Sequence, residues 1–248
     1  MKKIPMALGL YSVRTELSND WKATLKAVRE MGYDGVEFYG PMRYDVNELK
    51  ACLDELGLKL VGRHIGFDDI NIETVEYNRA LGNNRLVVPG LPADFTCSAD
   101  AWRETAKKFC EAADYLKTEG FILGYHNHDT EYAELDGEIP WDIFVPATEG
   151  KVFIQLDNGN ALKGGADVVE LVKKYPGRGN TVHLKPYSVK DGYATMIGED
   201  DIPWNEFFDE LDKQNATEWY ITEYECEEKY TQLGGAKACI DALKKMGL

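Results

Sequence analysis

The sequence predicts one domain, a single (β/α)8 TIM barrel over residues 1–248. Eight short β-rich runs alternate with amphipathic helical patterns from one end of the chain to the other. Successive runs start roughly 25 to 37 residues apart, the length of a strand, a helix and two loops in a βα repeat. A length of 248 residues is ordinary for an α/β barrel with one hydrophobic core.

The eight runs are the expected strands, because each is short and rich in apolar or β-branched residues. They are residues 7–13, 35–39, 59–64, 85–88, 121–126, 152–157, 181–185 and 219–223. Between them, residues 21–31 repeat apolar side chains every third position, and residues 46–56 end at Gly57, so both predict helices. A doubly wound open sheet is the alternative, but no glycine-rich phosphate loop follows the first run.

Composition excludes several classes of partner. The chain has 28 Lys and Arg against 43 Asp and Glu, a formal charge of −15, which repels nucleic acid and anionic membrane surfaces. No stretch of the sequence has the roughly 18 apolar residues needed to span a bilayer. Five cysteines without a Cys-x-x-Cys pair disfavour disulfides and a thiolate zinc site. We therefore expect a cytoplasmic protein that binds a small molecule, with homo-oligomerisation left open.

Polar residues concentrate where the predicted strands end. All four histidines do so, and so do several carboxylates: His64, His126, His128, His183, Glu37, Asp157, Glu223 and Glu225. In a (β/α)8 barrel these carboxyl ends form the face that carries the active site. A single histidine there is usually a hydrogen-bonded loop residue. We infer a site because four histidines and four carboxylates occur at strand ends together.

Four consecutive strands each supply one metal-ligand type. They are expected to bring His126, Asp157, His183 and Glu223 within reach of one divalent ion. Mn²⁺, Co²⁺, Mg²⁺ and Zn²⁺ all suit two imidazoles and two carboxylates, and Mn²⁺ is our first choice. A cation also explains how such a carboxylate cluster could stay ionised.

Period-two alternation places further polar residues on the inward side. Gln155 shares a side with Asp157, and Lys185 shares one with His183. Lys185 is expected to transfer protons or to clamp an anion. The expected substrate contacts are Glu37, His64, His128, Gln155, Asn158 and Lys185.

Several motifs together resemble the xylose isomerase-like barrel superfamily, specifically its sugar phosphate isomerase/epimerase branch. They are residues 33–38, 62–64, 124–128, 155–160, 183–185 and 220–223. The resemblance implies one divalent metal held by residues on strands five to eight, here His126, Asp157, His183 and Glu223. It also implies proton abstraction beside a carbonyl through a metal-stabilised enediolate.

The chain departs from the epimerase pattern at strand five, where His126 replaces a carboxylate. His126 could bind the metal while Glu223, His128, Lys185 or His64 moves protons, or His126 could itself be the base, with three protein ligands left on the ion.

The leading hypothesis for function is a metal-dependent sugar isomerase or epimerase acting on a free or phosphorylated monosaccharide. Its nearest rival is a metal-dependent lyase or dehydratase acting on a keto-sugar, an inosose or a 3-keto-glycoside. Two readings of other classes are an abasic-site endonuclease and a non-catalytic sugar-binding barrel. Substrate charge and the carbon that exchanges its proton are left open.

Overall fold

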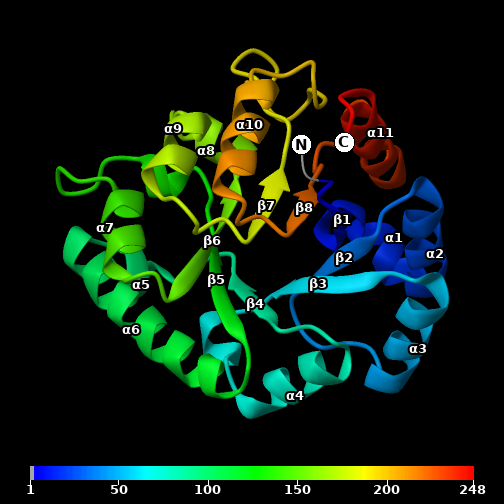
Figure 1. Ribbon diagram of the computed structural model, residues 1–248, viewed down its shortest axis with the longest axis horizontal. Coiled ribbons are helices and arrows are strands. Elements are labelled where there is room, and N and C mark those ends of the chain that lie inside the picture. Colours follow the sequence, from blue (N-terminus) through cyan, green and yellow to red (C-terminus); the bar gives the residue numbers. More distant parts are fainter. Residues whose placement is uncertain (1–2) are drawn as a thin grey trace.

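A computed structural model describes residues 3–248, and its eight parallel strands close into one barrel in chain order (Figure 1). The strands are β1 (Met6–Gly9), β2 (Gly35–Tyr39), β3 (Lys59–His64), β4 (Arg85–Val88), β5 (Ile122–His126), β6 (Val152–Asp157), β7 (Thr181–Leu184) and β8 (Trp219–Thr222). β1 pairs with β8 as well as with β2, which closes the sheet and confirms the predicted (β/α)8 fold.

Helices surround the strands as an outer ring (Figure 1). They are α1 (Arg14–Asn19), α2 (Trp21–Met31), α3 (Val46–Leu56), α4 (Ile72–Ala80), α5 (Ala93–Thr96), α6 (Ala99–Thr118), α7 (Pro140–Ala147), α8 (Asn158–Lys163), α9 (Val168–Lys174), α10 (Trp204–Gln214) and α11 (Gln232–Lys245). Short 3-10 turns are η1 (Leu10–Val13), η2 (Phe67–Asp69) and η3 (Thr130–Tyr132). The predicted helices 21–31 and 46–56 are confirmed as α2 and α3.

The expected first strand, residues 7–13, is wrong in its second half. The strand ends at Gly9, and Leu10–Val13 form the 3-10 turn η1. Leu10 and Val13 are fully buried in the core although they lie in this turn. The apolar run therefore continues past the end of the strand, which is why the sequence suggested a longer strand. β5, β7 and β8 are each one residue shorter than expected, whereas the other four strands match.

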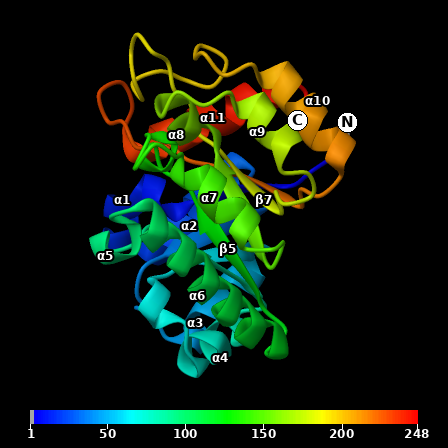
Figure 2. The ribbon, with the colours of Figure 1, turned by 90° about the vertical axis from the view of Figure 1, so that its left-hand side faces the viewer.

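The barrel interior changes character along its axis. Ala7, Val61 and Ile221 pack together as a small buried apolar cluster inside the sheet. Nearer the carboxyl ends the inward side chains are polar, among them Glu37 and Gln155. Figure 2 shows α1, α5 and α8, which follow β1, β4 and β6, at one end of the barrel, opposite the N-terminus. Polar inward residues and the loops that follow the strands therefore share one end of the molecule.

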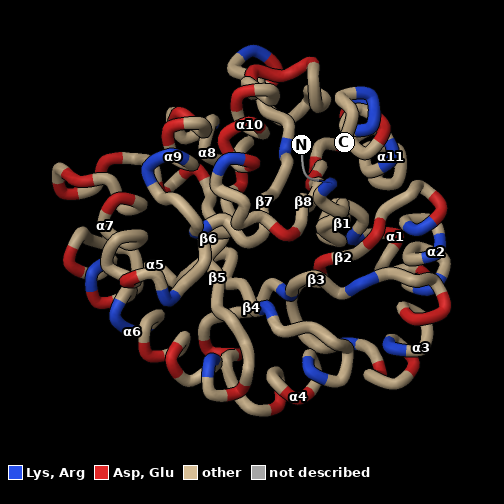
Figure 3. The backbone as a smooth tube through the Cα atoms, viewed as in Figure 1, with Lys and Arg blue, Asp and Glu red and all other residues tan. Residues whose placement is uncertain are grey.

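The outer surface carries charges of both signs along the helices and loops (Figure 3). Among residues 3–248, no helix combines the length and the apolar composition that a bilayer-spanning segment needs.

Candidate active site

A pocket of about 520 Å³ opens at the carboxyl ends of the strands. Every strand or the loop after it contributes to the lining, with one example from each being Tyr11, Tyr39, His64, Pro89, His126, Asn160, Lys185 and Glu223. The pocket therefore lies on the face where (β/α)8 enzymes bind their substrates.

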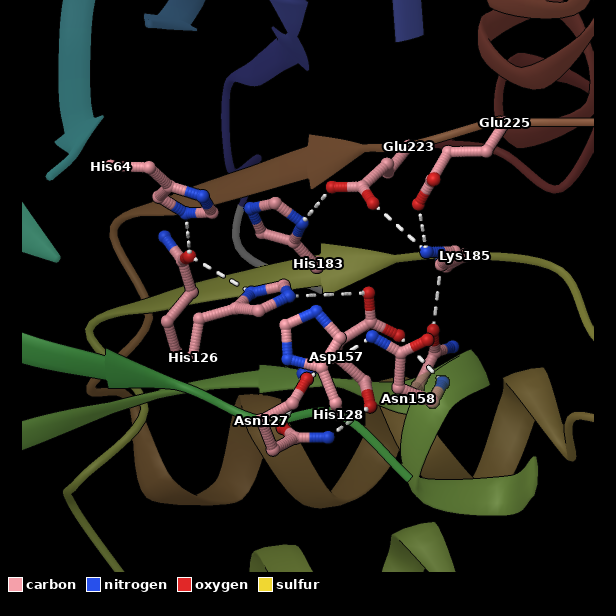
Figure 4. Close-up of polar contacts among 12 residues, drawn as sticks. His64, His126, Asn127, His128, Asp157, Asn158, His183, Lys185, Glu223 and Glu225 are labelled. Atoms are coloured by element: carbon pink, nitrogen blue, oxygen red, sulfur yellow. Dashed lines mark hydrogen bonds and ion pairs between the residues drawn. The ribbon is translucent and has the colours of Figure 1, made fainter. Parts of the chain in front are cut away.

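Three buried side chains fit a divalent cation, and one of them, Glu223, lines the pocket. The candidate ligand atoms of Asp157, His183 and Glu223 all lie within 4.8 Å of one another (Figure 4). His183 Nδ1 lies 2.9 Å from Glu223 Oε2, without the alignment of a hydrogen bond. Within residues 3–248, neither Asp157 Oδ2 nor His183 Nδ1 has a hydrogen-bond partner, although both atoms are buried. Unpaired buried polar atoms are costly, and a cation between them would remove that cost.

Local structure explains why Asp157 points one oxygen into this space. Asp157 is the last residue of β6 and the N-cap of α8, and its Oδ1 accepts a hydrogen bond from the Asn160 amide at 2.7 Å. The other oxygen is left for the site. Burial raises the pKa of Asp157, and the Lys185 ammonium partly opposes the rise.

His126 lies beside the three-residue set. Its Nε2 is 3.8 Å from Asp157 Oδ2, and its ring also belongs to a second candidate ligand set with His64 and His183. The structure thus brings the four expected ligands to one place, with Asp157, His183 and Glu223 as the compact core. Burial lowers the pKa of His126, and the neighbouring imidazoles lower it further, which keeps the ring neutral as a metal ligand must be.

Two buried side chains, Glu37 and Gln155, form a polar layer that contacts three of the histidines on the side away from the pocket. Glu37 lies 2.7 Å from His183 Nε2 and 3.0 Å from His64 Nε2, and it accepts a 2.7 Å hydrogen bond from Gln155 Nε2. Gln155 Oε1 in turn lies 2.6 Å from His64 Nε2 and 3.1 Å from His126 Nδ1. Burial disfavours ionisation of Glu37, but His64 and His183 more than offset it and hold the pKa of Glu37 well below its usual range.

This layer has a consequence for His183. Because its Nε2 is engaged by Glu37, its Nδ1 is the nitrogen that faces Asp157 and Glu223. A carboxylate behind a ligating imidazole fixes the orientation of the ring and raises its basicity.

Three of the expected substrate contacts lie outside the pocket lining. Glu37 and Gln155 lie in the buried layer just described, and Asn158 is fully buried with its Oδ1 accepting from the Lys185 amide at 2.8 Å. His64 and His128 do line the pocket. We propose that Glu37, Gln155 and Asn158 position other groups of the site and do not touch substrate.

Lys185 follows β7 and points into the pocket between two carboxylates. Its Nζ donates to Glu223 Oε1 at 2.9 Å and to Glu225 (Figure 4). Burial opposes its charge, but Glu223 and Asp157 more than compensate and raise the pKa of Lys185 well above its usual value. The same ammonium overcomes the burial of Glu223 and lowers the pKa of that carboxyl. Burial, with Glu223 nearby, raises the pKa of Glu225 to about 7.

Among the pocket-lining side chains that the sequence-based site residues omit are three that bear on its charge and shape, Asp129, Lys163 and Tyr193. Asp129 directly follows the expected His128, and Lys163 lies one helical turn after Asn160 on α8, so both carried a local signal. Tyr193 lies in the irregular loop between β7 and α10, where no periodicity could have marked it.

Comparison with known proteins agrees with this architecture. An inosose dehydratase from Clostridium perfringens is 25% identical, with 84% of this chain and 83% of the relative covered. A 2-oxo-tetronate isomerase from Haemophilus influenzae is 25% identical over 80% of this chain and 85% of its own length. Among solved structures, a sugar phosphate isomerase/epimerase from Parabacteroides distasonis superposes with a TM-score of 0.86 at 22% identity, with 98% of both chains covered.

The family model described as xylose isomerase-like TIM barrel matches residues 25–246. This range includes seven of the eight strands, the four expected metal ligands, and Glu37 and Gln155 of the buried polar layer. The chain therefore belongs to the xylose isomerase-like TIM barrel family.

Proposed function

We propose that this protein is a divalent metal-dependent enzyme that removes a proton beside the carbonyl of a small polyhydroxylated ketone and then expels a β-substituent. The observation that carries the proposal is the convergence of buried ligand atoms on Asp157, His183 and Glu223, with Asp157 Oδ2 lacking a hydrogen-bond partner among residues 3–248, next to a pocket that Glu223 lines. Relatives named inosose dehydratase support elimination as the outcome.

The ion would be held by Asp157, His183 and Glu223, with His126 as the fourth donor. When bound, it would polarise the carbonyl and stabilise the charge that develops on its oxygen. Imidazole and carboxylate together suit Mn²⁺, Co²⁺, Mg²⁺ and Zn²⁺, and Mn²⁺ is the ion we propose to test first.

Two proton transfers are proposed, one to Glu223 and one from His64. Glu223 is proposed to accept the proton beside the carbonyl. The Lys185 ammonium, 2.9 Å from its Oε1, balances its charge. His64 lines the pocket from β3, and its Nε2 is occupied by Gln155 and Glu37. Its Nδ1 is therefore the nitrogen left to face substrate.

Glu37, 3.0 Å from His64 Nε2, holds the ring in place, and His64 is proposed to donate a proton to a departing hydroxyl group. This pairing of one carboxylate with one imidazole is the observation that favours elimination over epimerisation. Reversible proton exchange on both faces of a carbon is better served by two carboxylates, and the strand-five carboxylate is replaced here by His126.

Isomerisation or epimerisation, the leading hypothesis from sequence, is the second candidate. It shares the first step, and the relative named 2-oxo-tetronate isomerase supports it.

The test uses Mn²⁺-loaded protein in D2O with inososes, free ketoses and keto-glycosides. Deuterium at the carbon beside the carbonyl reports proton abstraction. Loss of water or of an aglycone, seen by mass spectrometry, reports elimination, whereas isomerisation conserves mass. Metal content close to one ion per chain is expected, and chelation should abolish exchange. Full activity of a demonstrably metal-free preparation would refute the proposal.

His64→Asn separates the two proton transfers. We expect this variant to retain deuterium exchange while elimination falls by about 10²-fold or more, the usual range for a lost general acid. Equal loss of exchange and elimination would contradict the role of His64, and an absence of exchange with every metal and ketone would favour a non-catalytic sugar-binding barrel.

A further inference from the structure

We infer that the pocket takes an uncharged ketone, a free sugar or cyclitol derivative, and rejects phosphorylated or carboxylated analogues. This inference rests on the proposed function, because it names the substrate class of the same site. Its basis is that both ammonium groups in the pocket lining already have carboxylate partners, and that no arginine among residues 3–248 contributes to the lining.

Lys163 on α8 is the more exposed of the two ammonium groups. Its Nζ lies 3.2 Å from Asp129 Oδ2 and 5.5 Å from the centre of the Tyr193 ring. Lys185, deeper in the pocket, is bonded to Glu223 and Glu225 as described above, and its Nζ lies 4.9 Å from the same ring.

Tyr193 therefore lies near both ammonium groups. Its hydroxyl donates to Asn160 Oδ1 at 2.6 Å, which fixes the ring in this place. A phosphate entering here would have to compete with a carboxylate for either lysine, and its own charge would meet that carboxylate at close range.

Two arginines near this end of the barrel, Arg14 and Arg63, are engaged elsewhere. Arg14 lies over the Tyr11 ring at 4.9 Å and pairs with Glu227 at 3.4 Å. Arg63 is almost fully buried, with its guanidinium 5.3 Å from the centre of the Phe38 ring. Neither arginine lines the pocket.

The balance of charge points the same way. Asp129, Glu223 and Glu225 line the pocket, and Asp157 and Glu37 lie directly beneath it. Against the three carboxylates that line the pocket stand two lysines, Lys163 and Lys185, and each of them already has a carboxylate partner. A phosphate dianion in the pocket would therefore meet carboxylates beside both lysines.

The opposite wall offers contacts suited to an uncharged ring. Tyr11 and Tyr39 pack edge to face with their ring centres 5.1 Å apart, and both line the pocket. Aromatic faces bind the apolar C–H face of a sugar ring, while a polar group such as His128 can bond its hydroxyls.

The decisive variant is Asp129→Asn, which frees Lys163 from its partner. Calorimetric titration of the Mn²⁺-loaded protein with D-fructose 6-phosphate is expected to show binding at least tenfold tighter to this variant than to the wild type. Asp114→Asn is the matched control, because it frees Lys151 from an exposed 2.8 Å pair with the same change in net charge. The control should leave the affinity unchanged.

Glu225→Gln provides a second route, since it frees Lys185 in part, and it is expected to strengthen binding of the same ester. Equal or tighter binding of the ester by the wild type than by both variants would overturn the inference. So would deuterium exchange into fructose 6-phosphate by the wild type at a rate equal to that for free D-fructose.

Failure of the proposed function would look different. If no ketone exchanges its proton, the proposed chemistry falls. The titrations with the phosphate ester still decide whether the pocket rejects anions.

Discussion

Replacement of Asp157 by Asn should stabilise the metal-free protein and abolish its response to metal. Asn retains the oxygen that caps α8 by accepting from the Asn160 amide at 2.7 Å, so the local fold is preserved. It removes the buried charge, whose Oδ2 has no hydrogen-bond partner within the described chain. Because that oxygen shares the site with Glu223, the substitution also relieves repulsion between two carboxylates.

The magnitude is that of an unsatisfied buried polar group, about 1–3 kcal/mol, because the Asn amide NH2 can donate to the nearby Glu223 carboxylate where the Asp157 oxygen has no donor. For a protein of this size each kcal/mol corresponds to roughly 2–4 °C in Tm. In the presence of chelator, the variant should therefore melt several degrees above the wild type. With Mn²⁺ at about 100 times its Kd, the wild type should gain about 2.7 kcal/mol through preferential binding to the folded state. The variant should gain only a small fraction of this.

The assay is thermal unfolding with EDTA and with Mn²⁺, for wild type, Asp157→Asn and the surface control Asp114→Asn. The control should follow the wild type under both conditions. If the Asp157 variant is clearly less stable in EDTA, the carboxylate has a structural role in the metal-free fold. If Mn²⁺ stabilises it as much as the wild type, Asp157 is not a ligand.

Three further perturbations test other parts of the site and the core. Gly62→Ala places a Cβ 2.7 Å from Glu37 Oε1, so it should lower the unfolding free energy by about 1–3 kcal/mol in a denaturation experiment. Gly179→Ala is the control, because its Cβ meets only ordinary contacts, and it should leave the unfolding free energy nearly unchanged. Burial raises the pKa of Asp200 to about 7, so the folded protein keeps a proton that the unfolded chain loses, and stability should fall as pH rises from about 4 to 7. Asp200→Asn should remove that slope, and parallel Tm profiles for the two proteins would contradict it. Glu223→Gln should lower kcat far more than it changes KM, because an amide cannot accept the proton; an equal change in both constants would instead indicate a binding role.

Much of the site could be predicted from the sequence because strand geometry is local. Alternation with period two placed Gln155 with Asp157, and Lys185 with His183, on inward positions, and the structure confirms both pairs as buried inside the barrel end. Strand endings at His64 and His126 are likewise readable from the polar residues and turns that follow. The repeat length, combined with eight runs, was sufficient for the barrel itself.

Other features depend on how neighbouring strands are staggered when the barrel closes, which no single strand encodes. Stagger decides that Glu37 meets His64 and His183 beneath the pocket, 2.7 to 3.0 Å away, and that Asp157, His183 and Glu223 form the compact set with His126 at its side.

Contacts between different loops also cannot be predicted from the periodicity of the sequence. Asp129 and Lys163 are 34 positions apart in sequence yet form one of the ion pairs of the pocket, and Tyr193 lies near both pocket lysines although it belongs to an irregular segment. The sequence by itself determined the barrel and the end at which its chemistry lies. Only the tertiary structure decided which charges are already neutralised there, because ion pairing depends on distances between side chains brought together from separate βα units.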